Sequence, residues 1–104
     1  MELRKSPDIP IVCTLSDEDF RRREREIIGN LMPRVTSVES MAEGSKYSFP
    51  SDAETLEKVL EFIRLERQCC PFLDFHLSIE RTGPIKLSLT GPKGAKEFIE
   101  ATFK

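Results

Sequence analysis

Two runs of strictly alternating apolar and polar residues near the C-terminus constrain the fold more than any other feature of the chain. The first run covers residues 73–80 and the second covers residues 85–90, with the turn sequence Thr82-Gly83-Pro84 between them. Alternation at a period of two residues gathers the apolar side chains on one face of a β-hairpin. We therefore predict a sheet with one face packed on helices and the other open to water or to a protein partner.

The N-terminal half of the chain carries patterns for a strand, a helix and a second hairpin. Residues 9–15 (IPIVCTL) alternate after a proline, which predicts an entering strand. Residues 17–31 place apolar side chains at helical spacing, after a capping box that starts at Ser16. Residues 35–39 and 46–49 are short and rich in strand-forming residues, which predicts a hairpin with a turn between them.

A second helix is predicted between this hairpin and the alternating runs. Ser51 and Glu54 form a capping box that opens it. Pro71 disfavours helical geometry in the residue before it, so the helix should end at Cys69 or Cys70. Its predicted apolar stripe contains Leu56, Val59, Leu60, Ile63 and Cys70.

The full element order predicts the fold class. Breaking residues around Gly91 and Gly94 precede a closing helix, so the order is βαββαββα. This order favours an α+β two-layer sandwich, with helices on one face of a mostly antiparallel sheet. A length of 104 residues suits a single domain over residues 1–104. A thioredoxin-like order is the alternative, because a cysteine-containing strand runs directly into a helix.

Charge and hydropathy exclude several kinds of partner. The 16 basic residues are balanced by 18 acidic ones, so no overall positive field exists to bind nucleic acid. No apolar stretch is long enough for a membrane span, and the N-terminal residues lack the apolar core of a signal peptide. We expect a cytoplasmic protein whose thiols are reduced, with no partner in the membrane.

The distinctive chemistry lies in three cysteines, Cys13, Cys69 and Cys70. Cys13 precedes the start of a helix, where the positive end of the helix dipole favours a thiolate. The other two lie at the end of a helix, where unpaired carbonyl groups disfavour one. Three thiolates suit a soft ion such as Hg²⁺, As³⁺ or Cu⁺, whereas structural zinc would need a fourth ligand. The sequence therefore predicts a soft-metal site formed by the three cysteines.

The neighbours of the cysteine pair add detail to this hypothesis. Consecutive helical residues project about 100° apart, so Cys69 should lie at the edge of the apolar stripe with at least one thiol reachable from solvent. Glu66 and Arg67 fall near the inward stripe. They are candidates to surround the metal ligands, although a salt bridge at the rim of the core is the favoured interpretation.

Two other functions fit the same residues. In a thiol-disulfide protein, Cys13 would be the nucleophile and Cys69 or Cys70 would resolve the mixed disulfide. In an interaction module, all three cysteines would be core residues and the open sheet face would bind a protein partner. The lone histidine, His76, is predicted to lie on the open face, away from the cysteines.

The sequence ERQCCPF, followed by LDFHLSIE and PIKLSLTGPKGAKEFI, resembles an uncharacterised family of small bacterial proteins that share this cysteine-pair motif. The likeness covers about the last forty residues, and Cys13-Thr14-Leu15 also fits the family's pattern. Related domains occur beside or fused to regulators of the mercury-resistance type. The resemblance implies a heavy-metal connection and no established reaction.

Overall fold

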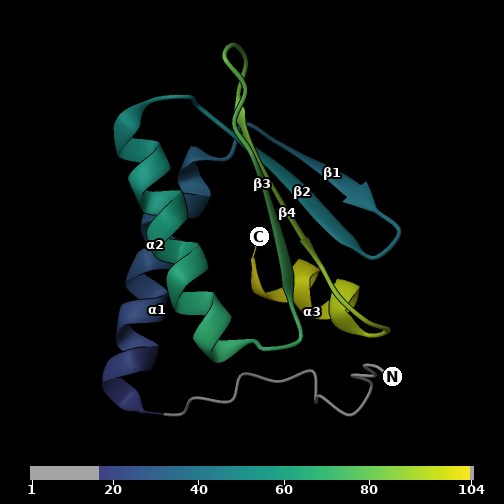
Figure 1. The fold of residues 1–104 in the computed structure, drawn as a ribbon. Helices are drawn as coiled ribbons and strands as arrows, with labels where there is room; N and C mark the ends of the chain where they lie inside the picture. The colour runs from purple at the N-terminus through teal and green to yellow at the C-terminus, as the bar shows by residue number, and fades with distance from the viewer. Residues whose placement is uncertain (1–16, 104) are drawn as a thin grey trace, which may run out of the picture.

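The fold is taken from a computed structural model, which describes residues 17–103 (Figure 1). The predicted strand over residues 9–15, the cap at Ser16 and the ligand candidate Cys13 lie outside these residues. The described elements, with a short 3₁₀ turn Met32–Arg34 after the first helix, are α1 (Glu18–Leu31), β1 (Ser37–Met41), β2 (Gly44–Phe49), α2 (Ala53–Cys69), β3 (Asp74–Ser78), β4 (Ile85–Thr90) and α3 (Ala95–Thr102).

The four strands form one sheet in the order β1-β2-β4-β3, and every neighbouring pair is antiparallel. Tyr47 pairs with Leu87, and Leu87 pairs with Leu77, so the apolar residues of three strands share one face. This confirms the predicted α+β class with a largely antiparallel sheet. Within the described residues, no strands pair in the parallel manner that a thioredoxin-like arrangement needs.

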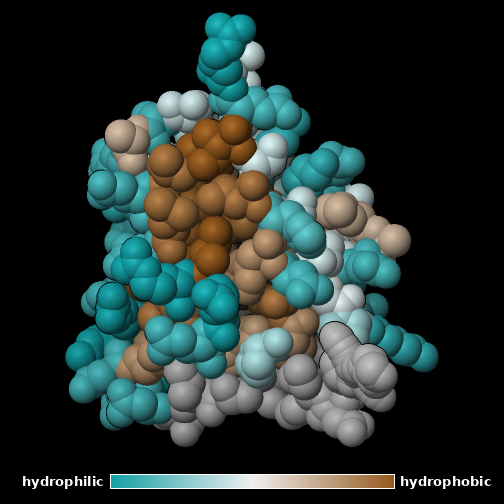
Figure 2. All heavy atoms as spheres, viewed as in Figure 1, coloured by the Kyte–Doolittle hydropathy of each residue, from teal (hydrophilic) through white to brown (hydrophobic). Residues whose placement is uncertain are grey.

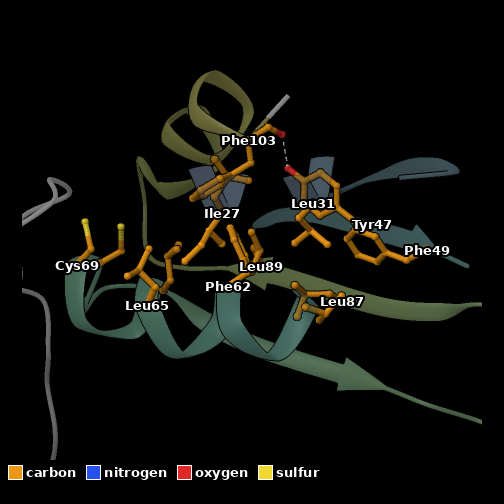
Figure 3. Packing of buried hydrophobic residues seen from close by; sticks show 14 of the residues in the cluster. Ile27, Leu31, Tyr47, Phe49, Phe62, Leu65, Cys69, Leu87, Leu89 and Phe103 are labelled. Atoms are coloured by element: carbon orange, nitrogen blue, oxygen red, sulfur yellow. Dashed lines mark hydrogen bonds between the residues drawn. The ribbon is translucent and has the colours of Figure 1, made fainter. Parts of the chain in front are cut away.

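The core lies between the inward face of the sheet and the helices. Phe62 of α2 packs edge to face on Phe103 after α3, with ring centroids 5.3 Å apart. The Tyr47 hydroxyl donates a buried hydrogen bond of 2.9 Å to the Phe103 carbonyl, which fastens the end of α3 to β2 (Figure 3). His76 is exposed on the other face, as its strand parity predicts.

The N-terminal caps of α1 and α2 differ from the predicted capping boxes. Asp17 caps α1, because its side chain accepts a hydrogen bond from the Phe20 amide. Asp52, rather than Ser51, caps α2, and its two carboxylate oxygens accept from the amide and the hydroxyl of Thr55. These contacts lower the pKa of Asp52, with the Thr55 amide contributing most. The predicted cap residues were wrong, because each turn contains several acidic or hydroxyl residues that could serve as a cap.

The apolar stripe of α2 is rotated from the predicted one. Leu60 is 41% exposed, although the pattern placed it inside. Leu56 and Ile63 are only partly buried. The reason is that α1 packs along α2, which adds a second buried side to a helix that already faces the sheet. The buried residues are Thr55, Val59, Phe62, Leu65, Glu66 and Cys69.

Candidate functional site

The last turn of α2 holds Glu66, Cys69 and Cys70 together in the interior. The helix ends at Cys69 with Cys70 as its cap residue, which confirms the predicted end before Pro71. The relative exposure of Glu66 and Cys69 is 0%, and that of Cys70 is 1%. The prediction of a thiol reachable from solvent is therefore wrong, because α1 covers the side of α2 that the apolar pattern left at the edge.

The spacing of these residues brings their side chains to one place. Positions three and four apart in a helix lie on the same face, so Cys69 and Cys70 both follow Glu66 closely. One possible ligand atom from each residue lies within 4.8 Å of the others. The Cys70 amide also donates to the Glu66 carbonyl at 2.7 Å, which keeps the chain helical up to the cysteine pair.

Helix α1 contributes a fourth residue to this cluster, Glu24, which is its second carboxyl group. Its Oε2 atom lies 3.7 Å from the Cys69 sulfur. The sequence pattern does not single out Glu24, because this residue belongs to a run of alternating charges that is typical of a solvated helix face. A signal was present: Glu24 lies four residues after Phe20 and three before Ile27, so it shares their inward stripe.

Glu66 is a buried carboxyl group with an incomplete set of partners. The Cys70 thiol donates to its Oε1 atom at 3.5 Å, whereas Oε2 is buried without a hydrogen-bond donor among the described residues. Burial, the hydrogen bond to Glu24 and the charge of Glu24 together raise the pKa of Glu66 to about 8, with burial the largest cause, and the hydrogen bond from Cys70 opposes them. A proton on Glu66 removes the conflict, because the neutral carboxyl can donate to Glu24. The predicted salt bridge at the rim is therefore wrong for Glu66.

The same environment affects Cys70. Burial raises the pKa of its thiol well above the usual range, and the charge of Glu66, its hydrogen bond and the charge of Glu24 all act in that direction. Arg21 opposes the effect only in part. Cys70 is consequently a protonated, unreactive thiol unless a cation displaces the proton. The expectation that the end of this helix disfavours a thiolate agrees with this direction, although burial is the larger cause.

The two neighbouring cysteines differ in their bonding. Cys70 is a free thiol, whereas Cys69 is disulfide-bonded. This differs from the expectation that all thiols of the chain are reduced. A disulfide sulfur carries no proton, so the 3.7 Å contact between Cys69 and Glu24 becomes a hydrogen bond only after reduction. Figure 3 shows Cys69 at one end of the buried cluster.

The remaining predicted site residues are not all brought together. Arg67 is exposed and lines a groove that also reaches Cys70, so it lies beside the buried cluster rather than inside it. Cys13 falls outside the described residues. The structure therefore assembles two of the three predicted ligands, together with Glu66 and the unpredicted Glu24.

The chain was compared with known proteins at three levels. No family model, no curated protein and no solved structure matches it. Among residues 17–103, no helix combines the length and apolar character needed to cross a membrane.

Proposed function

We propose that the reduced protein binds a soft metal or metalloid ion through Cys69 and Cys70, with Cys13 as the third thiolate and Glu66 beside them. The observation that carries the proposal is the Oε2 atom of Glu66, which is buried next to two sulfur atoms and receives no hydrogen bond from residues 17–103. Buried charges need a counter-charge or a proton. A bound cation would supply that charge to a cluster of acidic groups.

The thiols favour a soft ion over a hard one. A metal must displace the proton of Cys70, whose pKa is raised by burial, so only an ion with high affinity for thiolate can compete. Hg²⁺, As³⁺ and Cu⁺ have this property, whereas Mg²⁺ and Ca²⁺ prefer oxygen ligands. The resemblance to the bacterial family implies a heavy-metal connection, which fits this proposal. The expected reducing cytoplasm also fits it, because it would keep the cysteines available as ligands.

A second candidate function is thiol-disulfide exchange, which the disulfide-bonded state of Cys69 favours. Because Cys70 is free, we propose Cys13 as the partner of Cys69. Reduction by a cellular dithiol would transfer two electrons and two protons to this disulfide and oxidise the dithiol to its own disulfide. The two functions can follow one another, because reduction of the disulfide would release Cys69 as a metal ligand.

A titration of the fully reduced protein with Hg²⁺, As³⁺, Cu⁺ and Zn²⁺, in the presence of a competing thiol, tests the metal proposal. We expect one soft ion to bind to each protein molecule. The absorbance of the sulfur-to-metal bond measures this binding. Cys69→Ser and Cys70→Ser should each weaken it by about 100-fold or more, because each removes a thiolate from a three-sulfur site. Glu57→Gln on the exposed side of α2 is the control. Equal affinity in the wild type and in Cys70→Ser would contradict the proposal.

Redox titration separates the second candidate from the first. After equilibration of the protein in a glutathione buffer and proteolytic digestion, we expect a disulfide-linked peptide that joins Cys13 to Cys69. The same digest of Cys13→Ser should contain no such peptide. Three free thiols in the protein across the cellular range of redox potential would reject thiol-disulfide exchange while leaving the metal proposal intact.

The interaction-module hypothesis concerns the outer face of the sheet. This face carries Glu39, Lys46, Lys86 and His76, and no helix among the described residues covers it. Two results would support a protein partner on this face: the partner still binds after all three cysteines are replaced, and it no longer binds the Lys86→Glu variant.

A further inference from the structure

A largely apolar groove lies between α2 and the edge strand β3. Its volume is about 650 Å³, and it extends from Leu60 and Ile63 on the helix to Phe75 and Leu77 on the strand. Figure 2 shows the corresponding brown area at the upper left of the molecule, where α2 and β3 lie in Figure 1. Leu60 is 41% exposed, and Ile79, directly after β3, is 53% exposed. Contiguous apolar surface of this kind marks an interaction site.

The edge of the sheet beside this groove offers a backbone for pairing. β3 pairs with β4 on one side, and no strand among residues 17–103 pairs with its other side. Exposed edge strands are commonly protected by lysine or proline residues. β3 has the sequence DFHLS and contains neither. Its free edge is therefore suited to the addition of a further strand.

We propose that two copies of this protein form a symmetric dimer, in which the β3 strands pair along their free edges and the α2 helices pack side by side. Two-fold symmetry gives a closed dimer, because the same surface serves on both copies. With the symmetry axis perpendicular to the sheet, the paired strands are antiparallel and the helices of both copies lie on one face of a continuous sheet. This arrangement brings the two apolar areas, each spanning α2 and β3, into contact (Figure 2).

The charges of α2 fit this antiparallel arrangement. Residues 53–61 of the helix contain three acidic residues and one basic residue. In the second half of the helix, Arg64 and Arg67 are exposed, whereas Glu66 is buried. Antiparallel helices would place the acidic half of each copy beside the basic half of the other, and such complementary charges select the orientation of a complex. Helices packed in parallel would place like charges together.

The residues of β3 also indicate the register of the pairing. A pairing centred on His76 overlaps all five residues of the strand. It sets Phe75 of each copy opposite Leu77 of the other on the apolar face, and cross-strand pairs of this kind stabilise a sheet. A pairing shifted by two residues toward the hairpin turn would set Asp74 opposite Glu80, and like charges directly opposite are destabilising. The inference depends neither on a bound metal nor on the redox state of the cysteines.

Analytical ultracentrifugation of the full-length wild type tests the dimer. We expect the dimer fraction to increase with protein concentration and to persist under reducing conditions. Leu60→Asp places a charge in the proposed interface and should weaken dimerisation at least about tenfold. Val38→Asp, which changes an exposed apolar residue at the opposite edge of the sheet, should leave it unchanged. A wild type that stays monomeric up to about 1 mM, or equal weakening in the two variants, would overturn the proposal.

Cysteine cross-linking tests the register without a substitution in the core. Residues directly opposite in an antiparallel pair have Cα atoms about 4.5–5.5 Å apart, which is within the range of a disulfide. Under mild oxidation, His76→Cys should therefore form a covalent dimer at least about tenfold faster than the wild type. Glu39→Cys is the matched control, because Glu39 is the exposed central residue of β1, the edge strand at the other side of the sheet. Equal cross-linking of the two variants, or faster cross-linking of Glu39→Cys, would overturn the proposal.

Discussion

Glu66 shows how one residue's surroundings change its chemistry. Its position in the last turn of α2 would be unremarkable on an exposed helix, where a carboxylate is solvated. Here the side chain is buried beside Glu24 and two sulfur atoms, and its pKa rises to about 8. A neutral carboxyl at physiological pH can donate a hydrogen bond, whereas a carboxylate can only accept one. The buried cluster therefore holds a proton wherever no cation is bound.

Replacing this proton with a permanent amide should change how stability depends on pH. The pKa of Glu66 is 4.5 in an ordinary setting and about 8 in the folded protein, so the folded state binds the proton more tightly. The stability that this bound proton adds to the folded state is fully present below pH 4.5 and is lost as the pH rises through about 8. Glu66→Gln should consequently gain up to about 4 kcal/mol over the wild type at pH 9 relative to pH 5, since about three pKa units of linked stability lie between pH 5 and pH 8.

Urea denaturation at several pH values, with metal excluded, measures this difference. Glu57→Gln is the matched control, because it removes a carboxylate from the exposed side of the same helix. A difference between Glu66→Gln and the wild type that stays constant from pH 5 to pH 9 would contradict the raised pKa.

The accessibility of Cys70 supplies a second prediction at the same scale. Its thiol is buried and its pKa is raised by burial and by Glu66, so both access and thiolate fraction are low. In the metal-free native protein at pH 8, a thiol reagent should modify Cys70 at least about 100-fold more slowly than in the urea-unfolded protein. Ser78→Cys, on the exposed end of β3, provides a rapidly reacting reference. Comparable native rates at the two positions would show that the cluster opens readily.

At the scale of the elements, the alternating runs were predicted well and the first described hairpin less well. The residues of β3 and β4 follow a strict period of two, which only a strand satisfies. The predicted strands over residues 35–39 and 46–49 occur as Ser37–Met41 and Gly44–Phe49, shifted along the chain. Gly44 falls in the predicted turn between residues 39 and 46, where glycine is common, yet it lies in β2 against the backbone of β4.

Gly44 should be far less tolerant of substitution than another glycine of the same chain. A Cβ atom at Gly44 would overlap the Leu89 carbonyl, so the two strands would have to separate. We expect Gly44→Ala to destabilise the protein by about 2–4 kcal/mol. Gly29 lies within α1 with open space around it, and Gly29→Ala should stabilise the protein by about 0.5–1 kcal/mol. Thermal unfolding compares the two, and equal effects would contradict the close approach.

At the scale of the whole molecule, one buried hydrogen bond joins the last residues to the sheet. The Tyr47 hydroxyl reaches the Phe103 carbonyl across a separation of 56 positions in the chain. Tyr47→Phe keeps the ring but leaves this buried carbonyl without its donor, which should cost about 1–2 kcal/mol. Thr36→Val removes an exposed bond from a hydroxyl to the Ser48 carbonyl and should cost less than about 0.5 kcal/mol. Urea unfolding measures both, and a neutral Tyr47→Phe would contradict the role of this bond.

The sequence by itself determined the α+β class, the helices and the alternating hairpin, because periodicity and breaking residues act locally. It also indicated the end of α2 at the cysteine pair, since Pro71 acts on its immediate neighbour. Only the tertiary structure decided that Glu66 is buried, that Cys69 and Cys70 are covered and that Glu24 joins them. These facts depend on how α1 packs on α2, and the pattern of either helix alone does not contain that contact.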